Sequence, residues 1–202
     1  MILTKIFYSF FSKQQICLLT VARDNSITQI KYISTSFPCD SICPIERDTF
    51  VVGAYDHSPP VRTITVQRQE GSVQLGSLPN KTYKLGKSWC TYMQHEKSVV
   101  ITDTLAHSVH FYNLNNGTTK TVQNGEIREG VCGGGDRGSV FLCSSETHTI
   151  VQMSACGELL KVHSVGMVNP CTISVSRGGR RIVVANSTSD TKKTIKIFRV
   201  EY

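Results

Sequence analysis

The chain has 202 residues and a formal net charge of +7, with 40% hydrophobic and 18% charged residues. This composition is typical of a folded globular protein and excludes the disordered and fibrous classes. No apolar run approaches the ~18 residues of a membrane-spanning helix, so we expect no membrane segment. The positive charge permits RNA or an acidic protein surface as a partner, without selecting between them.

The N-terminal stretch has little of the pattern of a secretory signal. Its apolar core, IFYSFF, is short, Lys13 follows closely, and no small-residue cleavage pattern is present. Most of the eight cysteines fall within or beside apolar segments, and only Cys39 and Cys43 are closely spaced. Because a zinc site needs four ligands in reach, we expect no metal. These features predict a cytoplasmic protein with reduced cysteines.

The first 37 residues contain two runs rich in β-branched and apolar residues, QICLL at 15–19 and ITQIKYI at 27–33. Such runs predict β-strands. They match the following segments poorly. We therefore interpret residues 1–37 as a partial, divergent copy of the repeat that follows.

From about residue 40 the sequence repeats with a period of about 41 to 49 residues. SVVITDTLAHSVHFY from Ser98 aligns with SVFLCSSETHTIVQM from Ser139 at an offset of 41. RIVVANS from Arg181 and TFVVGAYDHS from Thr49 are further copies. Each copy has short runs of Val, Ile and Thr separated by Gly, Asn and Asp, without helical periodicity. Four short strands per copy are typical of one blade of a β-propeller.

The sequence therefore predicts an all-β fold, a β-propeller of four-stranded blades in a single domain. About five blades are expected, or part of a six-bladed ring. The first blade is expected to lack its innermost strand and the last its outermost. The predicted blades after the partial first one span about 40–80, 88–124, 130–165 and 172–202.

The stretch GVCGGGDRGSVFLC at 130–143 contains the G-x-G-x-x-G spacing of dinucleotide-binding loops, at Gly133, Gly135 and Gly138. Such a loop requires a following helix whose amide groups bind the pyrophosphate. Here the strand-like run SVFLCSS follows. We therefore expect the glycines to form a turn with positive φ between the first two strands of a blade, and no nucleotide cofactor.

The segment DTLAHSVHFY, Asp103 to Tyr112, resembles the signature of NHL repeats. SSETHTIVQM at 144–153 is a weaker match that keeps His148 and Ile150. GGRRIVVANS and IKIFRV add a resemblance to the C-terminal NHL propeller of tripartite-motif proteins, covering the chain from about Asp40 onward. This resemblance implies the substrate-recognition part of a ubiquitin ligase. The Cys- and His-rich RING and B-box do not occur in this sequence, so we expect no enzyme activity.

In a propeller, loops between the second and third strands share one rim with the connections between blades. The candidate binding residues assigned to this rim or the channel mouth beside it are Lys87, Trp89, His107, Arg128, His148, Lys192 and Lys193. The simpler interpretation is a turn role for the histidines, packing for Trp89 and solvated charge for the others.

We therefore expect a non-catalytic scaffold that binds a protein partner through this rim, with no metal and no cofactor. One alternative is an RNA-binding propeller, in which the basic rim and Trp89 provide affinity. Another is a lactonase-like, metal-dependent hydrolase. The 15 acidic residues form no ligand cluster in the sequence, which disfavours this alternative.

Overall fold

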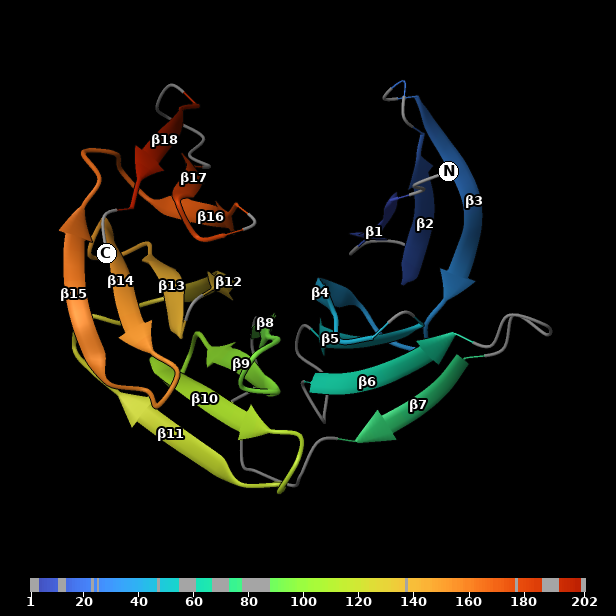
Figure 1. The fold of residues 1–202 in the computed structure, drawn as a ribbon, viewed down its shortest axis with the longest axis horizontal. Helices are drawn as coiled ribbons and strands as arrows, with labels where there is room; N and C mark the ends of the chain where they lie inside the picture. The colour runs from blue at the N-terminus through green and yellow to red at the C-terminus, as the bar shows by residue number, and fades with distance from the viewer. Residues whose placement is uncertain are drawn as a thin grey trace. The chain divides into compact units, whose positions relative to one another are not determined.

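The computed structural model describes residues 4–10, 14–22, 24, 26–46, 48–54, 61–66, 73–77, 88–136, 138–176, 178–186 and 193–200. The regular elements in these residues are β-strands, which form five antiparallel sheets (Figure 1). No helix in this part of the chain has the length and apolarity to cross a membrane. The all-β fold class predicted from the sequence is confirmed.

The chain divides into two compact units. Unit 1 comprises residues 1–81 and 85–88, and unit 2 comprises residues 82–84 and 89–202. The single domain expected from the sequence stays a prediction.

Unit 1 contains a sheet of order β1-β2-β3 and a sheet of order β4-β5-β6-β7. Their strands are β1 (Thr4–Phe10), β2 (Gln15–Val21), β3 (Ile27–Ser34), β4 (Cys39–Pro44), β5 (Thr49–Ala54), β6 (Val61–Val66) and β7 (Val73–Ser77). The core between the two sheets joins Ile16 and Ile33 to Val52 and Ile64, with Phe37 from the β3–β4 connection fully buried among them.

Unit 2 contains three sheets, each with its strands in chain order: β8 to β11, β12 to β15, and β16 to β18 (Figure 1). Their strands are β8 (Ser88–Met93), β9 (Ser98–Asp103), β10 (Ser108–Asn113), β11 (Thr119–Gln123), β12 (Gly130–Asp136), β13 (Ser139–Ser144), β14 (Thr149–Ser154), β15 (Leu159–Ser164), β16 (Pro170–Val175), β17 (Arg181–Asn186) and β18 (Ile195–Arg199).

The second strand of the middle sheet, β13, has apolar side chains on both faces because each face is covered by a neighbouring sheet. Val140 and Leu142 pack in a core with side chains of the β8–β11 sheet. Phe141 and Cys143, on the opposite face, pack in a second core with side chains of the β16–β18 sheet. Strands buried on both faces form near-continuous apolar runs, which explains the run SVFLC.

The expectation that the glycines of the G-x-G-x-x-G stretch form a turn is wrong for two of the three. Gly133 and Gly135 lie within β12, the innermost strand, with a register shift between Cys132 and Gly135. Gly134, at the bulge, has φ 106°, and its backbone lies close to Thr91 of β8 and Val175 of β16. Glycine permits this backbone conformation at a bulge. Only Gly138, with φ 77°, lies in the β12–β13 turn, and a strand follows it as expected.

Positive φ recurs in non-glycine residues that immediately precede strands. Gln14 before β2, His107 before β10 and His148 before β14 have φ values of 48°, 49° and 60°, and Lys97 before β9 and Asn169 before β16 have 51° and 50°. The conformation thus precedes first, second and third strands alike, and the expected loss of the innermost strand from the first blade stays a prediction.

Candidate functional site

One edge of unit 2, here called the connection rim, gathers the turns after β9 and β13, residues 193–194 before β18, and the β11–β12 and β15–β16 connections. Antiparallel pairing brings these segments to the same end of the sheets. Side-chain hydrogen bonds then tie turns to connections. The connection rim therefore consists of segments distant in sequence that are held in fixed positions.

The β11–β12 connection is fastened to the β13–β14 turn by a buried hydroxyl. Ser144 Oγ accepts a hydrogen bond from the Arg128 backbone N–H (2.9 Å) and donates one to the Arg128 carbonyl (3.1 Å). The Arg128 side chain lies 3.8 Å from the Glu146 carboxylate, with both side chains about half exposed. Such an exposed pair contributes only ~0–1 kcal/mol, but it offsets the charge of Arg128 locally.

The two histidines at equivalent repeat positions both belong to tight turns. His148 Nδ1 lies 2.7 Å from the Ser145 carbonyl and 3.2 Å from the backbone N–H of Asn169. Protonated, Nδ1 donates to the carbonyl, and unprotonated it accepts from the amide. In the β9–β10 turn, Asp103 Oδ1 accepts from the Ala106 N–H at 3.0 Å, whereas the buried Nδ1 of His107 has no hydrogen-bond partner among the described residues. The geometry of His148 supports a turn role.

A groove of about 460 Å³ opens at the connection rim beside His148. It is lined by the β15–β16 connection, including the buried Met167 and the half-exposed Val168, and by Thr194 and Lys196 at the start of β18. Lys196 Nζ donates hydrogen bonds to the carbonyls of Val165 (3.0 Å) and Gly166 (2.8 Å). The lysine thus holds the connection in place, and the lining of the groove combines apolar and polar side chains. We call this cavity the rim groove.

The structure brings some of the sequence-predicted site residues together. His148 lines the rim groove, and the exposed Lys193 directly precedes the groove residue Thr194 in the chain. Arg128 and His107 lie in other segments of the connection rim. Trp89 is partly buried and packs against both cores of unit 2, as its packing interpretation expects. Lys87 and Lys192 lie outside the described residues.

Sequence reasoning missed the groove residues Met167, Val168 and Lys196. The run VGMVNP between two strands offered little signal, because a single exposed apolar residue such as Val168 is common and the sequence does not show that Val165 and Met167 are buried. Lys196 carried no signal, because its contacts with Val165 and Gly166 depend on how two sheets pack.

Among the described residues, no group of three or more His, Cys, Asp or Glu side chains could hold a metal ion. The cysteine side chains that the structure describes are free thiols. Burial, followed by the neighbouring charge of Cys171, raises the pKa of Cys143 to about 12. A thiol with so high a pKa is unreactive as a nucleophile.

No family model matches this chain, and no curated protein matches it. Solved structures do match. A protein of unknown function from Desulfotomaculum acetoxidans has a TM-score of 0.67 at 12% identity, covering 98% of this chain and 62% of that one. A streptogramin B lyase has a TM-score of 0.61 at 14% identity, covering 98% and 66%. A 6-phosphogluconolactonase-like protein from Bacteroides uniformis has a TM-score of 0.65 at 12% identity, covering 96% of this chain and 63% of that one.

These structural neighbours are β-propeller-like proteins. The chain has a β-propeller fold. At such low identity the likeness shows the fold alone, and the chain spans about two thirds of the length of these neighbours or slightly less. The sheets of unit 2 are accordingly called blades below, and the connection rim is the edge where propeller blades are joined to one another.

Proposed function

We propose that this chain is a non-catalytic propeller scaffold that binds a protein partner through the connection rim of unit 2. The rim groove supports the proposal most directly. Its lining combines the apolar Met167 and Val168 with the polar His148, Thr194 and Lys196. Apolar contact area together with a few polar groups is typical of binding sites in proteins.

The hydrogen bonds of the connection rim add a second argument. Lys196 fixes the β15–β16 connection, and Ser144 fixes the β11–β12 connection. A surface that is ordered before binding loses less conformational entropy when a partner docks. Loops on a rigid frame can also vary in sequence without disturbing the core.

We propose further that the partner is recognised in the manner of the NHL propellers of tripartite-motif ubiquitin ligases. The residues that carry this resemblance form the β9–β10 turn, where Asp103 binds the Ala106 amide and His107 adopts positive φ. The β13–β14 turn keeps His148 in the same conformation. The resemblance would make this chain the recognition part of such a ligase, with ubiquitin transfer supplied elsewhere.

RNA binding is the second candidate, favoured by the net charge of +7. The connection rim offers it mixed support, because Arg128 lies beside Glu146 and Lys196 is bound to two carbonyls. Binding to RNA phosphates would fall steeply with salt, since bound counterions are released. Binding of a protein segment to the rim groove, with its apolar Met167 and Val168, would depend much less on salt concentration.

Affinity capture from cells that express this chain, with and without ribonuclease, tests the proposal. We expect a protein partner that survives ribonuclease and is lost with Val168→Glu, which places a charge in the rim groove. Leu160→Glu is the matched control, since Leu160 on β15 is similarly exposed (51% against 48%) but does not line the groove. Loss of the partner on ribonuclease treatment, or equal loss with both variants, would contradict the proposal.

A further inference from the structure

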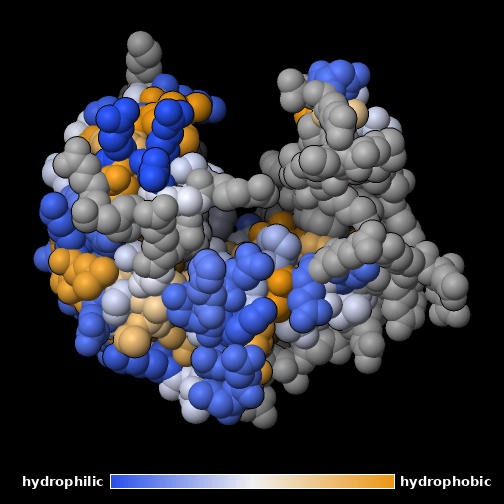
Figure 2. Space-filling view, viewed as in Figure 1, coloured by the Kyte–Doolittle hydropathy of each residue, from blue (hydrophilic) through white to orange (hydrophobic). Residues whose placement is uncertain are grey.

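The last blade of unit 2 ends in an edge strand with apolar side chains. β18 is the terminal strand in the order β16-β17-β18, and no strand pairs with its outer edge within the part of the chain that the structure describes. Ile195 and Ile197 are 70% and 69% exposed on this strand. Figure 2 shows hydrophobic surface among hydrophilic surface in the region of β17 and β18.

The outer edge of β18 presents backbone hydrogen-bonding groups. The Asn186 N–H donates to the Thr194 carbonyl and the Val200 N–H to the Arg180 carbonyl, so these positions of the β18 segment face β17. Because the hydrogen-bonding direction alternates along an antiparallel strand, the backbone groups of Ile195, Ile197 and Arg199 face outward. An open row of such groups is a template for another strand.

The internal repeat shows what occupies this place in the other two blades. In the middle blade, β14 pairs with β15, and Gln152 and Ile150 lie opposite Lys161 and His163. In the first blade of unit 2, β10 pairs with β11 in the same way, with Phe111 opposite Lys120. The outer edge of β18 corresponds to the positions that β11 and β15 cover.

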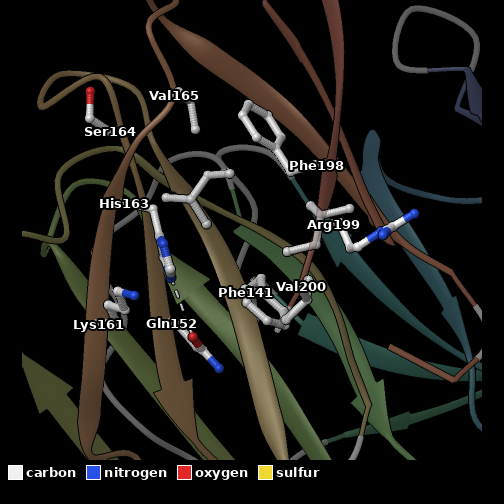
Figure 3. A pocket seen from close by; sticks show the side chains of 11 residues that line it. Phe141, Gln152, Lys161, His163, Ser164, Val165, Phe198, Arg199 and Val200 are labelled. Carbon is white, nitrogen blue, oxygen red and sulfur yellow. Dashed lines mark hydrogen bonds between the residues drawn. The ribbon is translucent and has the colours of Figure 1, made fainter. Parts of the chain in front are cut away.

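A pocket of about 270 Å³ lies between the middle and last blades (Figure 3). Phe141 and Phe198 form part of its apolar wall, while Gln152, Lys161 and His163 form a polar side. His163 Nε2 and Gln152 Oε1 are 3.3 Å apart, and Figure 3 shows the two side chains directed toward each other. The Arg199 guanidinium is directed away from this pair.

At the equivalent position between the first two blades of unit 2, only one of these three polar side chains has a polar counterpart. Lys120 occupies the place of Lys161, whereas Phe111 and Val122 occupy the places of Gln152 and His163, at an offset of 41 in the sequence. The β14–β15 turn covers them: a Cβ on Gly157 would lie 2.8 Å from Val122 Cγ2 and 3.1 Å from Phe111 Cε2. We call this the closed interface, and the one with the pocket the open interface.

Polar groups in a pocket that is otherwise apolar select the polar part of a ligand. Lys161 brings a positive charge to the pocket. Burial, followed by the charge of Lys161, lowers the pKa of His163. A carboxylate placed beside both side chains would pair with the lysine and favour the protonated histidine.

We propose that an extended, acidic segment of a partner protein pairs with the outer edge of β18 and places a Glu or Asp carboxylate in the pocket against Lys161 and His163. Main-chain pairing with a sheet edge supplies affinity, and a pocket for one side chain supplies specificity. The net charge of +7 favours an acidic segment. This inference rests on the proposed protein-binding function and specifies the kind of segment that is bound.

The test uses the full chain and three labelled ten-residue peptides of alternating Val and Thr. One has a central Glu, the second has Gln in its place, and the third keeps Glu but has N-methylated residues at alternate positions. Fluorescence anisotropy should show submillimolar binding of the Glu peptide, at least tenfold weaker binding of the Gln peptide, and none of the N-methylated peptide. Equal binding of all three, or no binding of the Glu peptide at 1 mM, would overturn the proposal.

Protein variants locate the site. Lys161→Glu should weaken Glu-peptide binding at least tenfold, whereas Lys120→Glu, at the same repeat position on the closed interface, should change it less than twofold. Ile197→Pro should abolish binding because it removes an outward N–H, and edge strands tolerate proline there. Its thermal unfolding and circular dichroism serve to confirm folding. Equal effects of the two lysine variants would refute the pocket assignment.

Two further readouts separate the outcomes. The imidazole pKa of His163, followed by NMR, should rise when the Glu peptide binds and stay unchanged with the Gln peptide. Sedimentation that shows self-association abolished by Ile197→Pro would make a second copy of this chain the occupant and overturn the proposal. Capture of a partner that is sensitive to Val168→Glu, with no peptide binding, would remove only this inference and leave the proposed function standing.

Discussion

The closed and open interfaces of unit 2 share the same strand, β13, and differ at their outer parts. Val140 and Leu142 on one face of β13 are fully buried at the closed interface, and Phe141 and Cys143 on the other are almost equally buried at the open one. Farther out, the closed interface has Phe111 and Val122 beneath the Gly157 turn. The open interface has Gln152 and His163 beside a pocket.

The difference shows which positions of a propeller repeat are constrained by packing. Inner strands must fill the space between blades, so both interfaces keep apolar side chains there. Outer positions are constrained only where a neighbouring turn covers them. At the open interface no turn among the described residues covers them, and the polar Gln152 and His163 stand there in place of apolar side chains. Such positions are those at which a binding site can form.

The largest expected effect tests the shared inner part. Leu142→Ala should lower the free energy of unfolding by about 3 kcal/mol, because it leaves a cavity in the closed interface. Phe141→Ala removes more atoms but opens onto the existing pocket, which water can enter, so we expect a loss no larger than that of Leu142→Ala. Urea unfolding of both variants measures the comparison. A clearly larger loss for Phe141→Ala would mean that the open interface is packed as tightly as the closed one.

The next effect tests the cover of the closed interface. Gly157→Ala should cost about 2–3 kcal/mol, because alanine is strained at φ 74° and its Cβ would meet Val122 at 2.8 Å. Gly178→Ala separates the two causes, since Gly178 has φ 87° but no atom within 4 Å of an added Cβ. There we expect only the backbone strain, about 1 kcal/mol. Similar losses in thermal unfolding of the two variants would show that contact with Val122 is not tight.

Much of the fold could be predicted from the sequence, because blades repeat and their buried strands are apolar. SVVIT and SVFLC fall on β9 and β13, and their offset of 41 reflects one blade. The glycines of β12 predict a turn, whereas the structure places Gly133 and Gly135 in a strand with a register shift against β13. The sequence does not predict β1, because the apolar run IFYSFF is also typical of a leader-like segment.

The candidate sites were harder to predict. His148 and Arg128 could be placed on a rim from strand order alone, since turns and connections alternate between two ends. The rim groove depends on how the β15–β16 connection packs on β18, which no local pattern encodes. The replacement of Phe111 and Val122 by Gln152 and His163 is visible at the repeat offset. The sequence does not show that both pairs lie at an interface between blades, because that follows from the strand register in the structure.

The smallest expected effect concerns the titration of His163 at the open interface. Burial, then the charge of Lys161, lowers the pKa of His163 in the folded protein, so folding disfavours the protonated imidazole. Its contribution to stability is present above the unfolded pKa of about 6.5 and is lost as pH falls through the lower folded pKa. We expect the free energy of unfolding to decrease slightly more between pH 7 and pH 5 in the native chain than in His163→Val, which copies the closed interface. The effect should be small because the side chain is only partly buried. Parallel pH profiles for the two proteins would show that the open interface leaves His163 as well solvated as in the unfolded chain.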